Sequence, residues 1–110
     1  MKYCFDLDGT LCTQRNRDYE NALPIKKNIK KVNELYNKGD TIIIFTARYM
    51  GRTQENKDEA IKLGYKFTEK QINSWGIKYH KLIFGKPLYD IIIDDKALFF
   101  NKNWSKFLWS

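Results

Sequence analysis

The segment TIIIFT, residues 41–46, says more about the fold than any other part of the sequence. It is a continuous apolar run with the length of a strand, and a threonine stands at each end. A run of this kind is typical of a strand that is covered on both faces of a parallel sheet. The segment therefore predicts an α/β domain in which parallel strands alternate with helices.

Three other segments have strand-like patterns. Lys2–Leu7 is a short apolar run, DIIIDD at residues 90–95 is a second, and both end in acids. His80–Phe84 is the third. Segments with helical signals lie between these runs, so the chain predicts βαβ units, a parallel sheet and helices on its faces.

The first helix is expected between two residues that punctuate the chain. Pro24 suits the first position of a helix, and apolar residues follow it at helical spacing. Gly39 is expected to end this helix. Residues 11–23, which precede it, show no clear periodicity and predict an exposed loop.

Two further helices are expected between residues 53 and 76. Thr53–Leu63 has a charged helical pattern that stops at Gly64. Thr68 and Gln71 have the spacing of a capping box, which predicts a separate helix ending at Gly76. Together these elements predict a single Rossmann-like three-layer domain over residues 1–110, with a parallel sheet and no cap domain.

The chain of 110 residues carries a net charge of +7. A basic protein attracts anions, which include nucleic acids, acidic membrane surfaces and phosphorylated small molecules, although a solvated lysine-rich surface gives the same charge. No segment is long and apolar enough to span a bilayer. The first residues lack the apolar run of a signal peptide, so we expect a cytoplasmic protein with no membrane partner.

Acids and a hydroxyl stand where the predicted strands end. Asp6 and Asp8 lie at the carboxyl end of the first strand, Asp94 and Asp95 lie at that of the last, and Thr46 ends the TIIIFT run. In a parallel sheet these ends share one crevice, where ligands bind. Clustered carboxylates need a cation, and hard oxygen ligands suit Mg²⁺. The sequence therefore predicts a magnesium site at this edge.

Two other residues complete a site for a phosphoryl group. Gly9 allows a sharp turn and a close approach of the backbone to a ligand. Lys86 supplies a positive charge for the transferring group and for an attacking carboxylate. Metal, lysine and hydroxyl together form the clamp that phosphoryl transfer requires.

These motifs resemble those of the haloacid dehalogenase superfamily of phosphotransferases. DLDGT at residues 6–10 matches the first motif, TIIIFT ending at Thr46 the second, Lys86 the third and IIIDD at residues 91–95 the fourth. The resemblance covers nearly the whole chain, and the four motifs occur in the family's order. It implies a phosphatase that forms a phospho-aspartate intermediate.

The resemblance also implies a role for each matching residue. Asp6 is the expected nucleophile and Asp8 the expected general acid and base. Thr46 and Lys86 are expected to bind phosphate and stabilise charge. The implied Mg²⁺ ligands are Asp6, the main-chain carbonyl of Asp8 and Asp94, and Asp95 is either a further ligand or an acid that contacts the ligands. Residues next to the motifs are expected to contact the substrate: Gly9, Thr10, Ala47 and Arg48.

Selectivity has to come from the domain itself. No cap fits between Thr10 and Pro24 or between Arg48 and Lys86, so the chain resembles capless members, above all short phosphatases of bacterial surface-polysaccharide biosynthesis. Arg48 then either grips a substrate anion or is a surface arginine. The same two readings hold for the loop arginines: Arg15 and Arg17.

The expected reaction is Mg²⁺-dependent hydrolysis of a phosphate monoester of a sugar, polyol or sugar acid. The alternatives are a phosphatase for nucleic-acid ends, nucleotides or phosphoproteins, and a non-catalytic phospho-acceptor or basic binding module. No stacked-aromatic or recognition-helix pattern favours nucleic acid. The tail, residues 96–110, is rich in aromatic side chains, which predicts either a homo-oligomer or a tail that folds back over the sheet.

Overall fold

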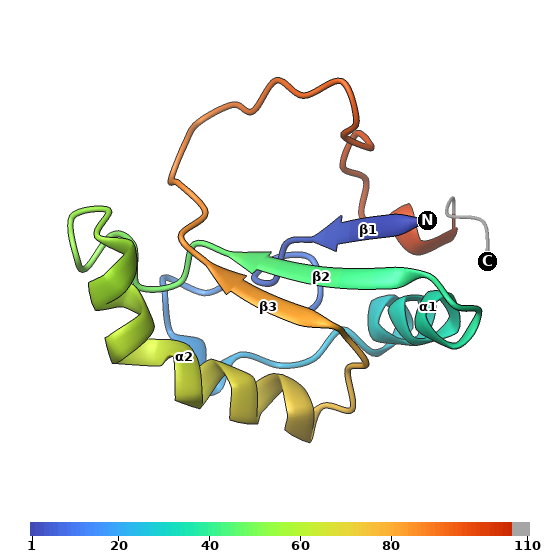
Figure 1. Cartoon of the computed structure of the whole chain (residues 1–110), viewed down its shortest axis with the longest axis horizontal. Coiled ribbons are helices and arrows are strands. Elements are labelled where there is room, and N and C mark those ends of the chain that lie inside the picture. The colour runs from blue at the N-terminus through green and yellow to red at the C-terminus, as the bar shows by residue number, and fades with distance from the viewer. Residues whose placement is uncertain (107–110) are drawn as a thin grey trace.

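Three parallel strands form the centre of the computed structural model, which describes residues 1–106 (Figure 1). They are β1 (Lys2–Phe5), β2 (Thr41–Thr46) and β3 (Lys81–Phe84), in the order β1-β2-β3. The two helices α1 (Lys26–Asn37) and α2 (Lys57–Ser74) connect them. Short 3₁₀ turns occupy Tyr19–Asn21 and Trp104–Lys106. The expected Rossmann-like α/β class with a parallel sheet is confirmed.

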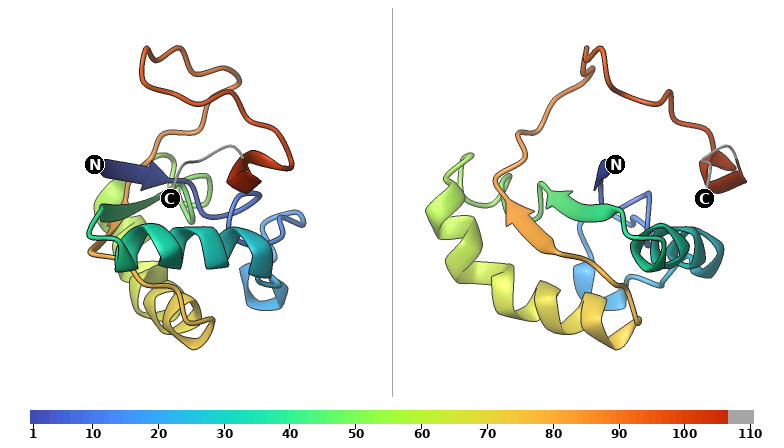
Figure 2. Two further views of the ribbon diagram at one scale, coloured as in Figure 1. Left: turned by 90° about the vertical axis from the view of Figure 1, so that its right-hand side faces the viewer. Right: turned by 45° about the vertical axis from the view of Figure 1, so that its right-hand side comes forward.

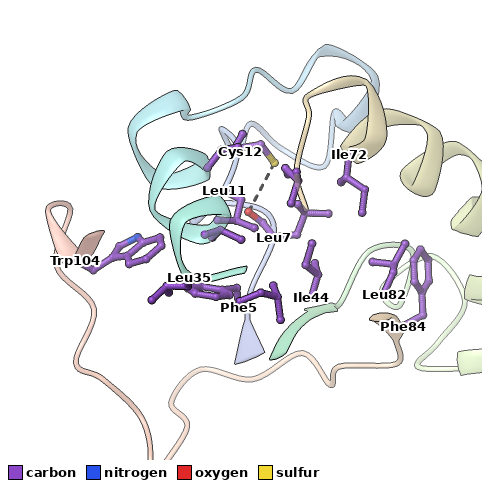
Figure 3. Close-up of a cluster of buried hydrophobic side chains, with 14 of the residues drawn as sticks. Phe5, Leu7, Leu11, Cys12, Leu35, Ile44, Ile72, Leu82, Phe84 and Trp104 are labelled. Carbon is purple, nitrogen blue, oxygen red and sulfur yellow. Dashed lines mark hydrogen bonds between the residues drawn. The ribbon is translucent and has the colours of Figure 1, made fainter. Parts of the chain in front are cut away.

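The register of the strands places one row of apolar side chains on the same face. Tyr3 pairs with Ile42, and Ile44 pairs with both Phe5 and Leu82. Because side chains alternate along a strand, these residues all point toward the helices. Figure 3 shows how Phe5, Ile44 and Leu82 meet in the core together with side chains from the helices.

Both helices cover that one face of the sheet. Figure 1 and the two views of Figure 2 agree that α1 and α2 lie on the same side. Within residues 1–106 no helix covers the other face, whose side chains Ile43, Phe45 and Ile83 are only partly buried. The expected third layer is therefore not formed by this part of the chain, which has one layer of helices and one sheet. Coil from residues 85 to 103 arches away beyond that face before the chain returns to the edge of β1.

Helix α1 ends as the sequence predicts. Gly39 has φ of 106°, a left-handed conformation that glycine adopts without strain, and its N–H donates to the carbonyl of Tyr36. The start of the helix differs slightly, because Ile25 is the N-cap residue and helical residues begin at Lys26 rather than at Pro24. The difference is within the usual fraying of helix ends.

The expected pair of helices between residues 53 and 76 is one continuous helix, so this prediction was wrong. Gly64 lies within α2 and does not end it. A Cβ atom on Gly64 would lie 1.9 Å from the Tyr49 ring, so glycine is present to let that ring pack on the helix. The actual N-cap is Asn56, whose side chain accepts from the N–H of Glu59.

The expected strand at residues 90–95 is absent, and the prediction was wrong. Ile91 and Ile93 are 80% and 96% exposed. Local hydrogen bonds hold this segment in a different conformation: the side chain of Asp94 accepts from the N–H of Lys96, and its carbonyl accepts weakly from Ala97. Such a turn competes with strand pairing, because it uses backbone groups that a ladder would need.

The aromatic tail is divided between a buried and an exposed part. Trp104 packs on Phe5 with ring centroids 5.4 Å apart, so this part folds back over the edge of the sheet. Phe99 is 92% exposed. Phe107, Leu108 and Trp109 lie outside the described residues, and the homo-oligomer stays a prediction. None of the helices in residues 1–106 is long and apolar enough to cross a membrane.

Candidate active site

A cavity of about 300 Å³ opens at the carboxyl edge of the sheet. Asp6 follows β1 directly, Ala47 follows β2, and Lys86 follows β3 after one glycine. These ends lie together because the three strands are parallel. The residues that line the cavity are Asp6, Asp8, Thr13, Gln14, Arg15, Arg17, Asp18, Tyr19, Ala47, Arg48, Lys86, Pro87, Leu88 and Tyr89.

Asp6 and Lys86 form an ion pair across the cavity. Lys86 Nζ lies 3.3 Å from Asp6 Oδ1, and the two side chains are 17% and 37% exposed respectively. Burial raises the pKa of Asp6 above its ordinary value, although the charge of Lys86 opposes this shift. Burial by itself lowers the pKa of Lys86, but the interactions with Asp6 and Tyr89 together outweigh burial and the pKa is raised. Lys86 is therefore a fixed positive charge beside Asp6.

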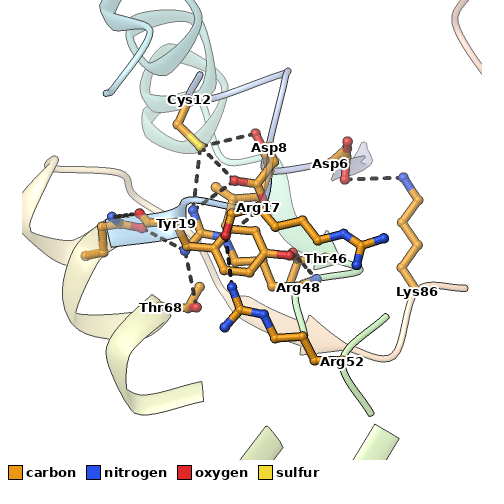
Figure 4. A network of polar contacts seen from close by, with 12 residues as sticks. Asp6, Asp8, Cys12, Arg17, Tyr19, Thr46, Arg48, Arg52, Thr68 and Lys86 are labelled. Atoms are coloured by element: carbon orange, nitrogen blue, oxygen red, sulfur yellow. Dashed lines mark hydrogen bonds and ion pairs between the residues drawn. The ribbon is translucent and has the colours of Figure 1, made fainter. Parts of the chain in front are cut away.

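Asp8 is held by a buried arginine. Arg48 Nε and Nη2 donate to Oδ2 and Oδ1 of Asp8, each at 2.9 Å (Figure 4). The side chain of Arg48 is fully buried and that of Asp8 is 14% exposed. Burial acts to lower the pKa of Arg48, but its bonds to Asp8 outweigh burial and the pKa is raised. This two-bond geometry fixes the plane of the Asp8 carboxylate.

Helix α2 and the loop after β1 contact the rest of the Arg48 guanidinium. Nη1 donates to Gln71 Oε1 at 2.7 Å and to Thr68 Oγ1 at 3.3 Å. The guanidinium also lies 4.7 Å from the centre of the Tyr19 ring. Neither reading of Arg48 from the sequence, as a grip for substrate at the rim or as a surface arginine, is right. Although Arg48 lines the cavity floor, its charge is already paired.

The contacts of Gly9 and Thr10 with substrate stay a prediction. Both residues form a tight turn after Asp8, and neither lines the cavity. Gly9 has φ of 85°, and its N–H donates to the carbonyl of Cys12. The carbonyl of Thr10 accepts from the side chain of Asn28 in α1. The turn therefore supports the site from outside the cavity, because the N–H of Gly9 and the carbonyl of Thr10 form hydrogen bonds within the fold.

Thr46 is buried behind the cavity wall. Its Oγ1 accepts from the N–H of Arg48 at 3.1 Å, and its side chain does not line the cavity. Its carbonyl accepts from the N–H of Lys86 at 3.2 Å. Thr46 therefore connects the ends of β2 and β3, and its contact with phosphate stays a prediction. Ala47 does line the cavity, as the sequence predicts.

Asp94 and Asp95 do not reach this cavity. Both are exposed on the coil that arches away from the sheet (Figure 1). Within residues 1–106, no three side chains of His, Cys, Asp or Glu gather as a metal site would require. The expected four-part metal site is therefore not assembled, because the segment that carries Asp94 forms no strand beside Asp6.

The oxygen donors that are present suit a different kind of magnesium site, with fewer protein ligands. Mg²⁺ is often bound by one or two carboxylates, with water and substrate phosphate as its other ligands. Asp6 offers a partly exposed carboxylate at the cavity, whereas the oxygens of Asp8 are bound by Arg48. Asp6 and the phosphate of a substrate thus provide the hard oxygen ligands that this ion prefers.

Sequence reasoning missed several residues of the site. Tyr19 and Tyr89 line the cavity, and Lys86 Nζ lies 5.5 Å from the centre of the Tyr89 ring. Gln71 looks like a capping residue in the sequence, but its amide bridges Arg48 and the carbonyl of Tyr19. The helical pattern of α2 could have revealed Gln71, because it shares a face with the buried Thr68.

The surroundings of Cys12 and His80 indicate that these two side chains stabilise the fold and take no part in chemistry. Cys12 Sγ lies 3.4 Å from Asp8 Oδ1, and burial raises the pKa of this thiol to about 12. It is therefore protonated and unreactive at neutral pH. Nδ1 of His80 accepts from the N–H of Ile42, and its ring stacks on Tyr36. These two contacts give this histidine a structural role.

Comparisons with known proteins support the fold. No protein-family model matches the chain. No curated protein matches it. The crystal structure of an MCSG target from Vibrio cholerae has the same fold, with a TM-score of 0.80 and 28% sequence identity over 96% of this chain and 93% of that one. This likeness confirms the α/β architecture, and the activity has to be inferred from the site.

Proposed function

We propose that this protein is a magnesium-dependent phosphatase that hydrolyses a phosphate monoester through a phospho-aspartate on Asp6. The observation that carries the proposal is the position of Asp6, whose carboxylate faces the cavity 3.3 Å from Lys86. Asp8, two residues later, is fixed by Arg48 at the same wall. A nucleophile, a fixed cation and an oriented carboxyl group are the parts that this reaction uses.

The reaction begins when a carboxylate oxygen of Asp6 attacks the phosphorus of the ester. The bond from phosphorus to the ester oxygen breaks, and protonated Asp8 gives its proton to the leaving alkoxide. Lys86 stabilises the negative charge on the phosphoryl oxygens. The products of this half are an alcohol and an acyl phosphate on Asp6.

Water then releases the phosphate. The carboxylate of Asp8 takes a proton from the water as its oxygen attacks phosphorus, and the acyl phosphate bond breaks to restore the Asp6 carboxylate. Atoms and charges balance, because Asp8 ends protonated as it began. The two bonds from Arg48 keep Asp8 in one orientation through both halves.

Magnesium is expected at Asp6, where it would neutralise charge on the phosphoryl group. The main-chain carbonyl of Asp8 is the second protein ligand that the family resemblance implies. Asp94 and Asp95 are proposed to join them, which requires the coil that carries them to move toward β1. The three exposed isoleucines in this coil favour such a move, because burying apolar surface lowers the free energy by about 25 cal/mol per Å².

A panel of phosphate esters tests this function. Purified protein should release inorganic phosphate from at least one sugar or polyol phosphate with Mg²⁺, and excess EDTA should stop the release. Asp6→Asn should lose turnover with any such ester. A variant that keeps full turnover would show that Asp6 is not the nucleophile. Stable phosphorylation of the protein without release of phosphate would indicate a phospho-acceptor module instead.

A further inference from the structure

Two of the four cationic side chains in the cavity have no acidic partner. Lys86 is paired with Asp6, and the charge of Arg48 is paired with Asp8. Arg15 and Arg17 also line the cavity, and within residues 1–106 neither makes an ion pair. Their charges are therefore open to a ligand.

The fold holds Arg17 at this place. Asn16 and Arg17 have φ of 47° and 63°, the left-handed conformation that costs a residue other than glycine about 1 kcal/mol. Arg52 donates to the carbonyl of Arg17 at 3.0 Å, and a Cβ atom on Gly51 would lie only 2.9 Å from Arg17 Nη1. The lack of a side chain at Gly51 leaves room for the guanidinium beside the loop.

The acids of the cavity do not neutralise these arginines. Asp18 is the third acid in the lining, and its Oδ2 accepts from the side chain of Asn21 at 2.8 Å. No ion pair joins Asp18 to Arg15 or Arg17 in the described part of the chain. Two arginines without an acidic partner therefore line the same small space as Asp6, whereas the phosphoryl group itself needs only Lys86 and the metal.

We infer that Arg15 and Arg17 form a second anion site, so that the substrate is a small phosphate ester with a second anionic group. This inference rests on the proposed function and narrows its substrate class. Guanidinium groups bind carboxylate and phosphate oxygens with two parallel hydrogen bonds, so either anion fits. A cavity of about 300 Å³ is at the small end of ligand sites, which suits a short sugar acid or bisphosphate.

Matched pairs of esters test the inference and distinguish the two anions. Sorbitol 6-phosphate and 6-phosphogluconate differ in a terminal carboxylate, and fructose 6-phosphate and fructose 1,6-bisphosphate differ in a second phosphate. In at least one pair we expect kcat/KM to be about tenfold higher for the ester with the second anionic group, the size of one charge-assisted hydrogen bond. The pair with the larger ratio identifies the preferred anion, and the ratio should fall as salt is added.

Variants connect this preference to the two arginines. In the double variant Arg15→Gln/Arg17→Gln the ratio should fall to about one. Lys66→Gln is the matched control, because it removes a charge from an exposed position of α2 that does not line the cavity. It should keep the ratio of the unaltered protein. A ratio that is the same in all three proteins overturns the inference.

Binding to Asp6→Asn separates this inference from the proposed reaction. Calorimetry of this variant compares the affinities for sorbitol 6-phosphate and 6-phosphogluconate, and for the two fructose phosphates, without any turnover. Tighter binding of the ester with the second anionic group, lost when the two arginines are replaced, supports the second anion site even if no ester is hydrolysed. Equal affinities within both pairs overturn it, even if the phosphatase activity is found.

Discussion

Arg48 binds both carboxylate oxygens of Asp8, and each of the two hydrogen bonds measures 2.9 Å. The arginine is fully buried, and its three remaining N–H groups donate to Thr68, Gln71 and Sγ of Cys12. A side chain in this position can no longer hold substrate. We therefore regard Arg48 as a positioning residue that keeps the proposed general acid and base in one orientation.

Arg48→Lys should separate this role from substrate binding. Lysine keeps the positive charge but cannot make two parallel bonds to Asp8. We expect kcat to fall by roughly 10²-fold, the lower range for general acid–base catalysis, while KM changes little. Steady-state kinetics with any ester that is turned over measures this. A raised KM at unchanged kcat would instead mean that Arg48 binds substrate.

Thr68→Val provides the matched control for Arg48. It removes the 3.3 Å bond to Nη1 and leaves both bonds to Asp8 in place. The free energy of unfolding should fall by about 1 kcal/mol, the usual contribution of one hydrogen bond. The turnover number should stay within a few-fold of that of the unaltered protein. A loss as large as that of Arg48→Lys would mean that general loosening of α2, and not the geometry of Asp8, controls the reaction.

Asp6→Asn should stabilise the protein at neutral pH when no metal is added. Burial holds the pKa of Asp6 above its ordinary value, so ionising this carboxyl costs more free energy in the folded state than in the unfolded state. Stability that is present below the unfolded pKa is lost as pH rises through the folded pKa. Asparagine cannot ionise and avoids this loss.

Thermal unfolding at two pH values measures the effect. At pH 7 the midpoint of Asp6→Asn should exceed that of the unaltered protein, and at about pH 3 the two midpoints should converge. Added Mg²⁺ should reverse the order at pH 7, because only the carboxylate binds the ion. A variant that is less stable at pH 7 without metal would show that the bond to Lys86 outweighs burial.

Magnesium should stabilise the folded protein, and its binding should depend on Asp94. A ligand that binds only the folded state raises the free energy of unfolding by about 2.7 kcal/mol when its concentration is 100 times Kd. Asp94→Asn should raise the Kd for Mg²⁺ by about tenfold, which requires the exposed coil to reach the site. Asp90→Asn is the control, because Asp90 is an exposed acid on the same coil. Equal Kd values for the two variants would leave Asp6 as the main protein ligand.

The order of the elements and the place of the site could be predicted from the sequence. TIIIFT forms β2 with its predicted bounds, and Asp6, Ala47 and Lys86 all reach the carboxyl edge of the sheet. These predictions succeed because an apolar run and the parallel arrangement depend on local pattern and on chain connectivity. The position of a residue at a strand end follows from the fold and does not depend on the contacts of the side chains around it.

The partners of the polar groups could not be predicted in this way. Arg48 lies two residues after β2, but its burial depends on Thr68 and Gln71, which are twenty or more residues further on. The apolar run at residues 91–93 fits a strand, yet a strand also needs a neighbour, and the turn at Asp94 uses the backbone locally. Contacts between residues that are far apart in the sequence, like those of Arg48, are set by the whole fold and leave no signal in the local sequence pattern.

Gly64→Ala should destabilise the protein, against the usual preference of helices for alanine. In a helix interior alanine is favoured over glycine by about 1 kcal/mol. Here the added Cβ would lie 1.9 Å from Cε2 of Tyr49. The Tyr49 ring has little room to move, because Arg52 lies 5.0 Å from its centre and Tyr19 is at the same distance. We expect a loss of about 1–3 kcal/mol, as for other overpacked sites.

A double-mutant cycle in urea makes this prediction specific. In a Tyr49→Ala background the clash is absent, so Gly64→Ala should be neutral or stabilising by up to about 1 kcal/mol. The difference between the two backgrounds measures the contact of the ring with the helix. If Gly64→Ala stabilises the unaltered protein as well, Tyr49 does not pack on α2 in solution. Its ring would then not hold Tyr19 and Arg52 in place beside the cavity.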